Sequence, residues 1–409
     1  MTAVLARAGM PVEKTMRPAL HSDAATALAT RWWQAAVLAC YVAWIAWVGS
    51  HHEAWFDEAQ AWLLARDSTP WQLIAERVRY EGSPGLWHLI LWGAIHAGLP
   101  YAGLWIVSAS FAGAGAAVVL WRAPFPPPLR VLIISSYFYG YQFPVVARSY
   151  AVDLLLVPLA ACCFADRVAR PRRYAALIAL IANLNTHGFI FAAMLGLELT
   201  WQLWRAGATR RGDAWAALAL AALGGGIALA STWQPADNDF IYSGDTPPAI
   251  AAIVAYVIHA LADTVPLGHN AVALMLGTTL GVVASVLLVI PAVRFIRASP
   301  HWPLMLGIAG ALCTFSGFKY ANVWHSGILW LAFVFGLWVG WATPVEPALR
   351  RRLVLTLTLL FGWQTVQTVR AGLWDVAEVY SPARPAAAAT LAWQARHPGG
   401  RVAAFGYKA

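Results

Sequence analysis

Apolar segments long enough to cross a lipid bilayer recur along this chain between residues 34 and 370. The hydrocarbon core of a bilayer is about 30 Å thick, which a helix of about 20 residues spans. A helix also satisfies its own backbone polar groups, which have no water to bond in lipid. Of the 409 residues, 60% are hydrophobic and 11% are charged, whereas soluble domains carry about 25% charged residues. The sequence therefore predicts an all-α polytopic membrane protein.

The arginines between these segments orient the predicted helices, because basic loops stay on the cytoplasmic side. They lie at Arg122 and Arg130, Arg167 to Arg173, Arg205 to Arg211, Arg294 and Arg297, and Arg350 to Arg352. An arrangement of about eleven spans places all of them on one face. The spans lie near residues 34–50, 102–121, 130–146, 150–166, 174–186, 188–204, 213–232, 270–293, 302–318, 323–342 and 352–370.

This topology divides the chain into three parts. Residues 1–33 form a cytoplasmic tail, residues 34–370 the transmembrane domain, and residues 371–409 a short external tail that is too small to fold alone. Residues 248–264 are interpreted as interfacial or re-entrant, because a span there would move the later arginine loops outside. The expected location is the inner (plasma) membrane of a bacterium, with membrane lipid as a partner. The net charge of +9 belongs to the loops, so no nucleic acid is expected to bind.

Residues 51–100 differ from the rest because acidic side chains outnumber arginines there. The positive-inside rule places this segment outside, where it is expected to form short helices at the membrane surface. Thr69-Pro70 and Ser83-Pro84 are typical helix starts, with a capping hydroxyl followed by proline. Residues 84–98 are too short for a span and predict an interfacial helix.

Polar and ionisable residues from distant parts of the chain fall at the outer ends of the predicted helices. Such residues are costly at a membrane boundary and mark functional sites, so we expect a chemical site there. Its candidate members are Asp57, Glu58, Glu81, Arg148, Tyr150, Asp153, His187, Lys319, Tyr320 and His325.

Several of these residues also have purely structural interpretations. Asp57 could cap a helix, with Gln60 completing a capping box, and Glu58 could only complement the dipole of a first helical turn. Arg148 could be a snorkelling anchor.

Asp153 lies a turn inside an apolar helix, where it needs a partner, and Arg148 or Lys319 would be the nearest source of charge. His51, His52 and Glu53 are interpreted as interfacial bystanders.

Phe56-Asp57-Glu58-Ala59-Gln60-Ala61-Trp62 resembles the Asp-Glu motif in the first outer loop of GT-C superfamily glycosyltransferases. These include protein O-mannosyltransferases and the enzymes that add aminoarabinose to lipid A. The segments 80–88, 147–153, 186–188 and 318–320 are similar to later polar segments of that superfamily. The resemblance covers roughly residues 34–340. It departs from the family pattern at Ser83, where a histidine is common, and in the outer domain, which is reduced to residues 380–409.

The resemblance implies an inverting glycosyltransferase, moving a hexosyl or pentosyl group from a polyprenyl-phosphate-sugar to a glycan, lipid or protein acceptor at the outer face. Asp57 would be the general base, and Glu58 or Glu81 would orient the acceptor.

The remaining candidates would serve the donor in this scheme. Arg148, Lys319 and His325 would bind the donor phosphate, and Asp153 would hold Arg148 or Lys319 in place. A supporting or substrate-contacting role is expected for Tyr150, His187 and Tyr320. No cofactor is required, although Asp57 and Glu81 are the expected ligands if Mg²⁺ or Mn²⁺ takes part.

Three other functions compete with this one. A transporter or flippase for a lipid-linked sugar could use the same basic groove, but would favour inverted repeats with broken helices. A polymerase or ligase of lipid-linked glycans usually has a large outer loop with several arginines. A membrane scaffold would leave the one-sided convergence of charged residues unexplained.

Overall fold

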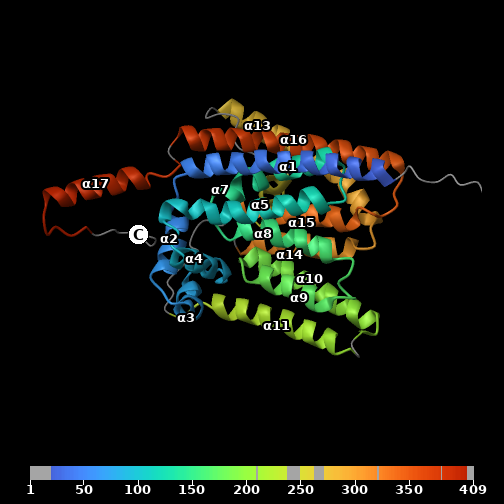
Figure 1. Ribbon diagram of the computed structural model, residues 1–409, viewed down its shortest axis with the longest axis horizontal. Coiled ribbons are helices and arrows are strands. Elements are labelled where there is room, and N and C mark those ends of the chain that lie inside the picture. Colours follow the sequence, from blue (N-terminus) through green and yellow to red (C-terminus); the bar gives the residue numbers. More distant parts are fainter. Residues whose placement is uncertain are drawn as a thin grey trace, which may run out of the picture.

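The computed structural model describes residues 20–208, 211–236, 249–261, 271–319, 322–378 and 380–402, and the secondary structure of these residues is entirely helical. The long helices run side by side, and the short helices α2 to α4 gather at one end of them (Figure 1). We call this the α2 end of the bundle. The prediction of an all-α chain is confirmed for the described residues.

The α-helices of the bundle are α1 (Leu20–His51), α5 (Leu104–Arg122), α6 (Pro127–Ser135), α7 (Phe143–Val145), α8 (Tyr150–Cys163), α9 (Pro171–Ala182), α10 (Thr186–Arg205), α11 (Gly212–Thr232), α12 (Ala249–Leu261), α13 (Ala271–Ala298), α14 (Trp302–Phe318), α15 (Ser326–Gly340) and α16 (Pro347–Ala377). Those at the α2 end are α2 (Phe56–Arg66), α3 (Pro70–Gln72) and α4 (Leu86–His96), and α17 (Ala383–Arg396) projects beyond it (Figure 1). Short 3₁₀ or π turns join them: η1 (Leu73–Arg77), η2 (Val78–Tyr80), η3 (Tyr101–Gly103), η4 (Phe138–Gln142) and η6 (Val323–His325).

Four helical segments among the described residues are long and apolar enough to cross a membrane: Trp32–His51, Tyr101–Arg122, Gly212–Thr232 and Val323–Gly340. Apolar helices of 10–17 residues, such as α8 and α14, lie between them in the chain. These features are consistent with a helical membrane protein. The arrangement of eleven spans stays a prediction.

The expectation of one continuous helix over 130–146 is wrong. Helix α6 ends at Ser135, Ser136 is extended, and the π turn η4 and α7 complete the segment. A break of this kind is tolerated in an apolar bundle only where other parts of the protein satisfy the freed carbonyls. Here Tyr41 Oη donates to the Tyr139 carbonyl at 2.8 Å, and Trp44 Nε1 to the Gly140 carbonyl at 3.0 Å.

The spans expected at 174–186 and 188–204 correspond to α9 and α10, which meet at residues 183–185. Asn185 is the N-cap of α10, since its Oδ1 accepts the backbone N–H of Gly188 at 2.7 Å. Helix α12 falls in the ambiguous segment 248–264 and packs against α14 and α15, with Tyr256 buried among them.

Helix α16 continues seven residues past the expected end of the last span, from residue 370 to Ala377, and so carries Asp375 into a buried position at the α2 end. The helical stretch expected between Arg384 and Arg396 is present as α17.

The start of α3 is as expected, because the Thr69 hydroxyl accepts the Gln72 N–H. Ser83-Pro84 does not act in the same way. Helix α4 begins after Gly85, and the N–H of Leu86 donates to the Asn183 carbonyl at 3.1 Å.

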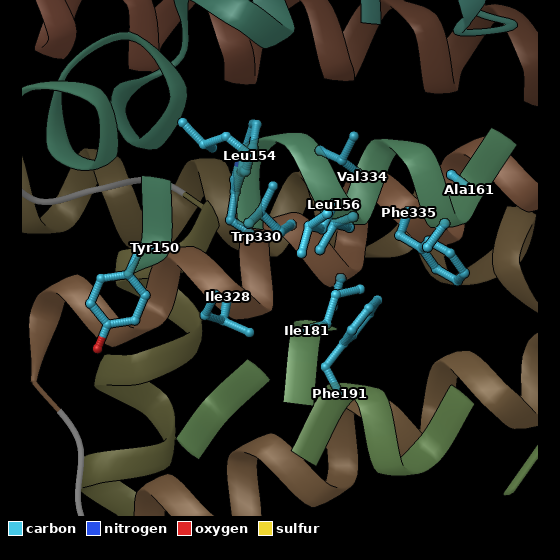
Figure 2. Packing of buried hydrophobic residues seen from close by; sticks show 14 of the residues in the cluster. Tyr150, Leu154, Leu156, Ala161, Ile181, Phe191, Ile328, Trp330, Val334 and Phe335 are labelled. Atoms are coloured by element: carbon cyan, nitrogen blue, oxygen red, sulfur yellow. The ribbon is translucent and has the colours of Figure 1, made fainter. Parts of the chain in front are cut away.

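The buried core runs through most of the bundle, and Figure 2 shows part of it. Leu154 of α8, Phe191 of α10, and Trp330 and Phe335 of α15 are almost wholly buried there, and the ring centres of Phe191 and Phe335 lie 5.4 Å apart. Tyr150 lies at one end of this cluster (Figure 2). Packing at this density holds the start of α8 in a defined place.

Candidate functional site

Asp57 and Arg148 are in direct contact at the α2 end of the bundle. Asp57 stands in the first turn of α2, and Arg148 in the short connection between α7 and α8. Arg148 Nη1 donates to Asp57 Oδ2 at 2.5 Å. The Asp57 side chain is 11% exposed and that of Arg148 is 27% exposed, so the pair is partly accessible at the surface of the protein. Charge-assisted hydrogen bonds of this length are among the stronger ones in proteins.

Asp57 does not cap α2, so the capping interpretation is wrong. The N-cap residue is Trp55, and Asp57 already has a helical position. Gln60, the expected partner in a capping box, instead donates to Glu81 across the gap between α2 and η2. The Asp57 carboxylate is thus directed at Arg148 rather than at its own backbone.

Glu58 is buried and does more than complement a helix dipole. Its Oε1 accepts the backbone N–H of Ala147 at 2.7 Å, and its Oε2 accepts that of Trp55 at 3.1 Å. His52 Nε2 lies 3.0 Å from the same Oε2. These contacts tie the start of α2 to the segment that carries Arg148. Because Glu58 is 1% exposed, its place favours a positioning role over contact with an acceptor.

The sequence suggested that His52 is an interfacial bystander, and this interpretation is wrong. Its Nδ1 lies 2.8 Å from Asp375 Oδ2, and Tyr141 donates its hydroxyl proton to the same oxygen at 3.0 Å. Burial by itself lowers the pKa of His52, but the hydrogen bonds and charges of Asp375 and Glu58 outweigh it and raise the pKa from 6.5 to about 9. The ring of Tyr380 lies 4.5 Å from the imidazole.

Sequence reasoning missed this group because its members are far apart in the chain. The one available signal was an aspartate near the end of the last long apolar helix, an expensive residue at a membrane boundary.

Asp153 does not pair with Arg148, so that expectation is wrong. Asn185 Nδ2 donates to Asp153 Oδ2 at 2.7 Å. The other oxygen, Oδ1, is buried without a hydrogen-bond partner among the described residues. Asp153 therefore joins α8 to the start of α10, and Arg148 is held by Asp57 instead.

A row of rings leads from Arg148 into the bundle. The Arg148 guanidinium lies 5.8 Å from the centre of the Tyr150 ring, and Tyr150 lies 6.1 Å from His325. His325 stacks on His187 with a centroid distance of 4.5 Å. His325 Nδ1 accepts the backbone N–H of Asn322 at 2.9 Å. An imidazole nitrogen that accepts carries no proton, so His325 is neutral and presents Nε2–H.

Three rings in or beside this row bury a nitrogen that has no hydrogen-bond partner among the described residues: Trp55, Trp324 and His187. Trp55 lies 5.5 Å from Trp324, and Trp324 lies 5.8 Å from His325. Buried polar groups are normally satisfied. These three nitrogens belong to rings that follow one another from His325, and a ligand rich in oxygen atoms could satisfy them.

The other candidates are placed less centrally. Lys319 is exposed at the C-terminal end of α14, four residues after Phe315, whose ring lies 5.2 Å from His187. Tyr320 lies outside the described residues.

The two carboxylates expected to share a cation have other partners, since Asp57 bonds Arg148 and Glu81 bonds Gln60. A guanidinium beside Asp57 also disfavours a divalent cation there. Within the described segments, no group of three or more His, Cys, Asp or Glu residues could hold a metal ion.

A cavity of about 340 Å³ opens beside η1 and η2, near the end of α11. It is lined by Ala75, Glu76, Arg77, Arg79, Tyr80 and Pro235. Arg79 Nε donates to the Trp233 carbonyl at 2.9 Å, which fixes one wall. Glu81 follows Tyr80 directly and bonds Gln60, which lies one helical turn from Asp57. Glu81, the residue after the lining residue Tyr80, is thus hydrogen-bonded to the helix that carries Asp57.

Comparison of the chain with protein-family models, with curated proteins and with solved structures finds no match. The resemblance to GT-C glycosyltransferases therefore rests on the quoted motifs alone.

Proposed function

We propose that this protein is an inverting glycosyltransferase that takes a sugar from a polyprenyl-phosphate carrier and transfers it to an acceptor at the outer face of a membrane. The observation that carries the proposal is the contact between Asp57 and Arg148. It joins a candidate general base to a candidate phosphate-binding cation at a partly exposed position. The motif resemblance supports the same assignment.

The proposed architecture has about eleven spans, with the N-terminus in the cytoplasm and α2 to α4 on the outer surface. The grouping of α2 to α4 at the end of the bundle where α1 ends supports it (Figure 1). The donor's lipid tail would lie between helices, with its phosphate near Arg148.

In the proposed reaction, the donor phosphate competes for the Arg148 guanidinium and so releases the Asp57 carboxylate. Asp57 then accepts the proton of the acceptor hydroxyl as that oxygen attacks the anomeric carbon. The bond from the anomeric carbon to the phosphate oxygen breaks, and its electron pair leaves with polyprenyl phosphate. Positioned proton transfer of this kind contributes about 10²–10⁴-fold to a rate.

The leaving phosphate gains negative charge, which must be stabilised where it develops. Arg148 supplies fixed positive charge, and the Nε2–H of neutral His325 supplies a hydrogen-bond donor. Lys319, directly after the C-terminal end of α14, is exposed and adds a second cation at the rim of the proposed site. The unsatisfied nitrogens of Trp55 and Trp324 are the proposed donors to the sugar oxygens.

The cavity beside η1 and η2 is the proposed entry for the acceptor. Two arginines and one glutamate line it, which favours an acceptor with negative charge. Glu81 follows the lining residue Tyr80, and Gln60 lies one helical turn after Asp57, so the hydrogen-bonded pair is proposed to orient the incoming hydroxyl.

The experiment is transfer by purified protein in proteoliposomes that contain a polyprenyl-phosphate-sugar labelled in the sugar, with a solubilised cell-envelope fraction as the source of acceptor. Asp57→Asn should reduce the release of polyprenyl phosphate by at least 10²-fold, because the amide cannot accept the proton. Asp67→Asn is the matched control, since Asp67 follows the same helix and pairs with Arg66 on the surface.

Equal release by Asp57→Asn and the unaltered protein would contradict the proposal. A flippase would instead move the labelled donor across the bilayer with its glycosidic bond intact. The same assay separates the two functions, because it measures both the position and the integrity of the donor.

A further inference from the structure

Two adjacent contacts join α2 to the segment before α8. Asp57 bonds the Arg148 side chain, and Glu58 accepts the N–H of Ala147 at 2.7 Å. Consecutive residues on one segment thus meet consecutive residues on the other. The second contact is buried and the first is partly exposed, and because their residues adjoin in both segments, a shift of the buried contact would also move the exposed one.

His52 stands behind this double contact, between two carboxylates. Its Nε2 lies 3.0 Å from Glu58 Oε2, and its Nδ1 lies 2.8 Å from Asp375 Oδ2. Carboxylate oxygens only accept, so both ring nitrogens must donate for both bonds to form. With both carboxyl groups ionised, this geometry corresponds to the doubly protonated imidazolium.

The surroundings of His52 are compatible with this charge. The groups that face it or its two carboxylates are Tyr141, Tyr380 and Tyr101, and the Asp57–Arg148 pair lies beside Tyr380. The phenols carry no charge near neutral pH, and Asp57 is matched by Arg148. The buried centre thus has two carboxylates against one imidazolium. Backbone N–H groups bond Glu58 and the Tyr141 hydroxyl bonds Asp375 Oδ2, whereas Asp375 Oδ1 is buried without a hydrogen-bond partner among the described residues.

We propose that His52, as an imidazolium shared by Glu58 and Asp375, is a positioning residue that holds Asp57 opposite Arg148, so that the alignment of the reactive pair depends on pH and on the end of α16. The catalytic part of this inference rests on the function proposed above, whereas the structural part does not. His52 touches neither donor nor acceptor and acts through Glu58.

Loss of the proton would leave two buried carboxylates competing for a neutral ring that can donate to only one of them. We call the contacts of His52 with Glu58 and Asp375 the clamp. Since the pKa of His52 is raised to about 9, the clamp should be intact at neutral pH and should be lost in alkaline solution. Once the clamp is lost, the hydrogen bond between Glu58 and the Ala147 N–H becomes less stable, and Arg148 loses its fixed position.

The structural part is tested by hydrogen–deuterium exchange of the full-length protein in nanodiscs, between pH 7 and 10, corrected for intrinsic exchange. The peptide that contains Ala147 should be protected at pH 7 and lose protection toward pH 10. His52→Gln should exchange at least tenfold faster at pH 7. His51→Gln is the control, because His51 is exposed and, among the described residues, hydrogen-bonds only its neighbours Trp47 and Ser50. Equal protection in His52→Gln and His51→Gln would overturn the inference.

Asp375→Asn is the second variant, and it keeps the size and an accepting oxygen but removes one charge. In this variant, the pH at which the Ala147 peptide loses protection should fall by about one unit or more. The alkaline limb of transferase activity should move with it, which a merely structural role would not produce. Coincident limbs in this variant and the unaltered protein would also overturn the inference. If the unaltered protein has no transferase activity, the proposed function fails, while the exchange experiment still decides the clamp.

Discussion

Nδ1 of His52 lies 2.8 Å from Oδ2 of Asp375, although 323 residues separate the two in the chain. The contact joins the end of α1 to the end of α16. His52 also contacts Glu58, which is the neighbour of Asp57 in α2. The ends of α1 and α16 therefore both lie next to the candidate site.

The stability of the protein should fall in alkaline solution because of this contact. The folded pKa of His52, about 9, is above its unfolded value of 6.5. A raised pKa stabilises the fold fully below about pH 6.5, and that contribution is lost as pH rises through about 9. Near pH 7 it is on the order of 2 kcal/mol. The unfolding temperature in detergent should therefore fall more between pH 7 and 10 for the unaltered protein than for His52→Gln, and parallel curves would contradict this.

Binding of the lipid phosphate should depend on Arg148. Arg148→Ala should weaken binding of polyprenyl phosphate by roughly 10- to 100-fold, since hydrogen bonds to charged groups contribute about 1.5–3 kcal/mol. Arg66→Ala is the control, because Arg66 forms an exposed pair with Asp67 near the end of α2. Titration of the protein in nanodiscs with polyprenyl phosphate, followed by native mass spectrometry, measures the difference. Unchanged affinity for Arg148→Ala would remove this residue from the phosphate site.

Filling the cavity beside η1 and η2 should block the acceptor and not the donor. Ala75 lines this cavity, and Ala75→Phe places a ring in it. Transfer should fall at least tenfold, while polyprenyl phosphate binding should stay within twofold of normal. Loss of both activities together would show that the cavity is not a separate acceptor route.

Gly115 should tolerate no side chain, because α5 and α8 approach closely there. A Cβ at this position would lie 2.1 Å from the Leu154 carbonyl oxygen, a backbone atom that cannot easily move. Gly115→Ala should cost about 1–3 kcal/mol as an overpacked contact. Gly113→Ala in the same helix meets only Val42 at 3.5 Å and should be neutral. Thermal unfolding of the two variants compares them, and equal unfolding temperatures would show that α5 and α8 can separate without cost.

The helical class of the protein could be predicted because the hydrocarbon environment leaves few solutions for the backbone. Apolar length alone predicted helices at Tyr101–Arg122 and Gly212–Thr232. It failed over 130–146, because side chains of other helices bond the freed carbonyls there: Thr368 bonds Ser135 at the break, and Tyr41 and Trp44 bond Tyr139 and Gly140 in η4. Periodicity within one segment contains no information about such donors.

The residue types of the candidate site also followed from sequence, since charged groups at a membrane boundary are conspicuous. Their pairing did not. Asp153 was expected to meet Arg148, five residues away, or Lys319. It bonds Asn185 instead, and Arg148 bonds Asp57, 91 residues away. Short sequence separation is a poor guide where helix packing brings distant ends together.

The sequence by itself determined that this chain is a bundle of apolar helices with polar residues concentrated at their ends, because hydrophobicity and charge are local properties of each segment. Only the tertiary structure decided that Asp57 faces Arg148 and that His52 is a buried link between Glu58 and Asp375. Those relations depend on how α1, α2, α8 and α16 pack, and packing is set by the shapes of all the helices at once.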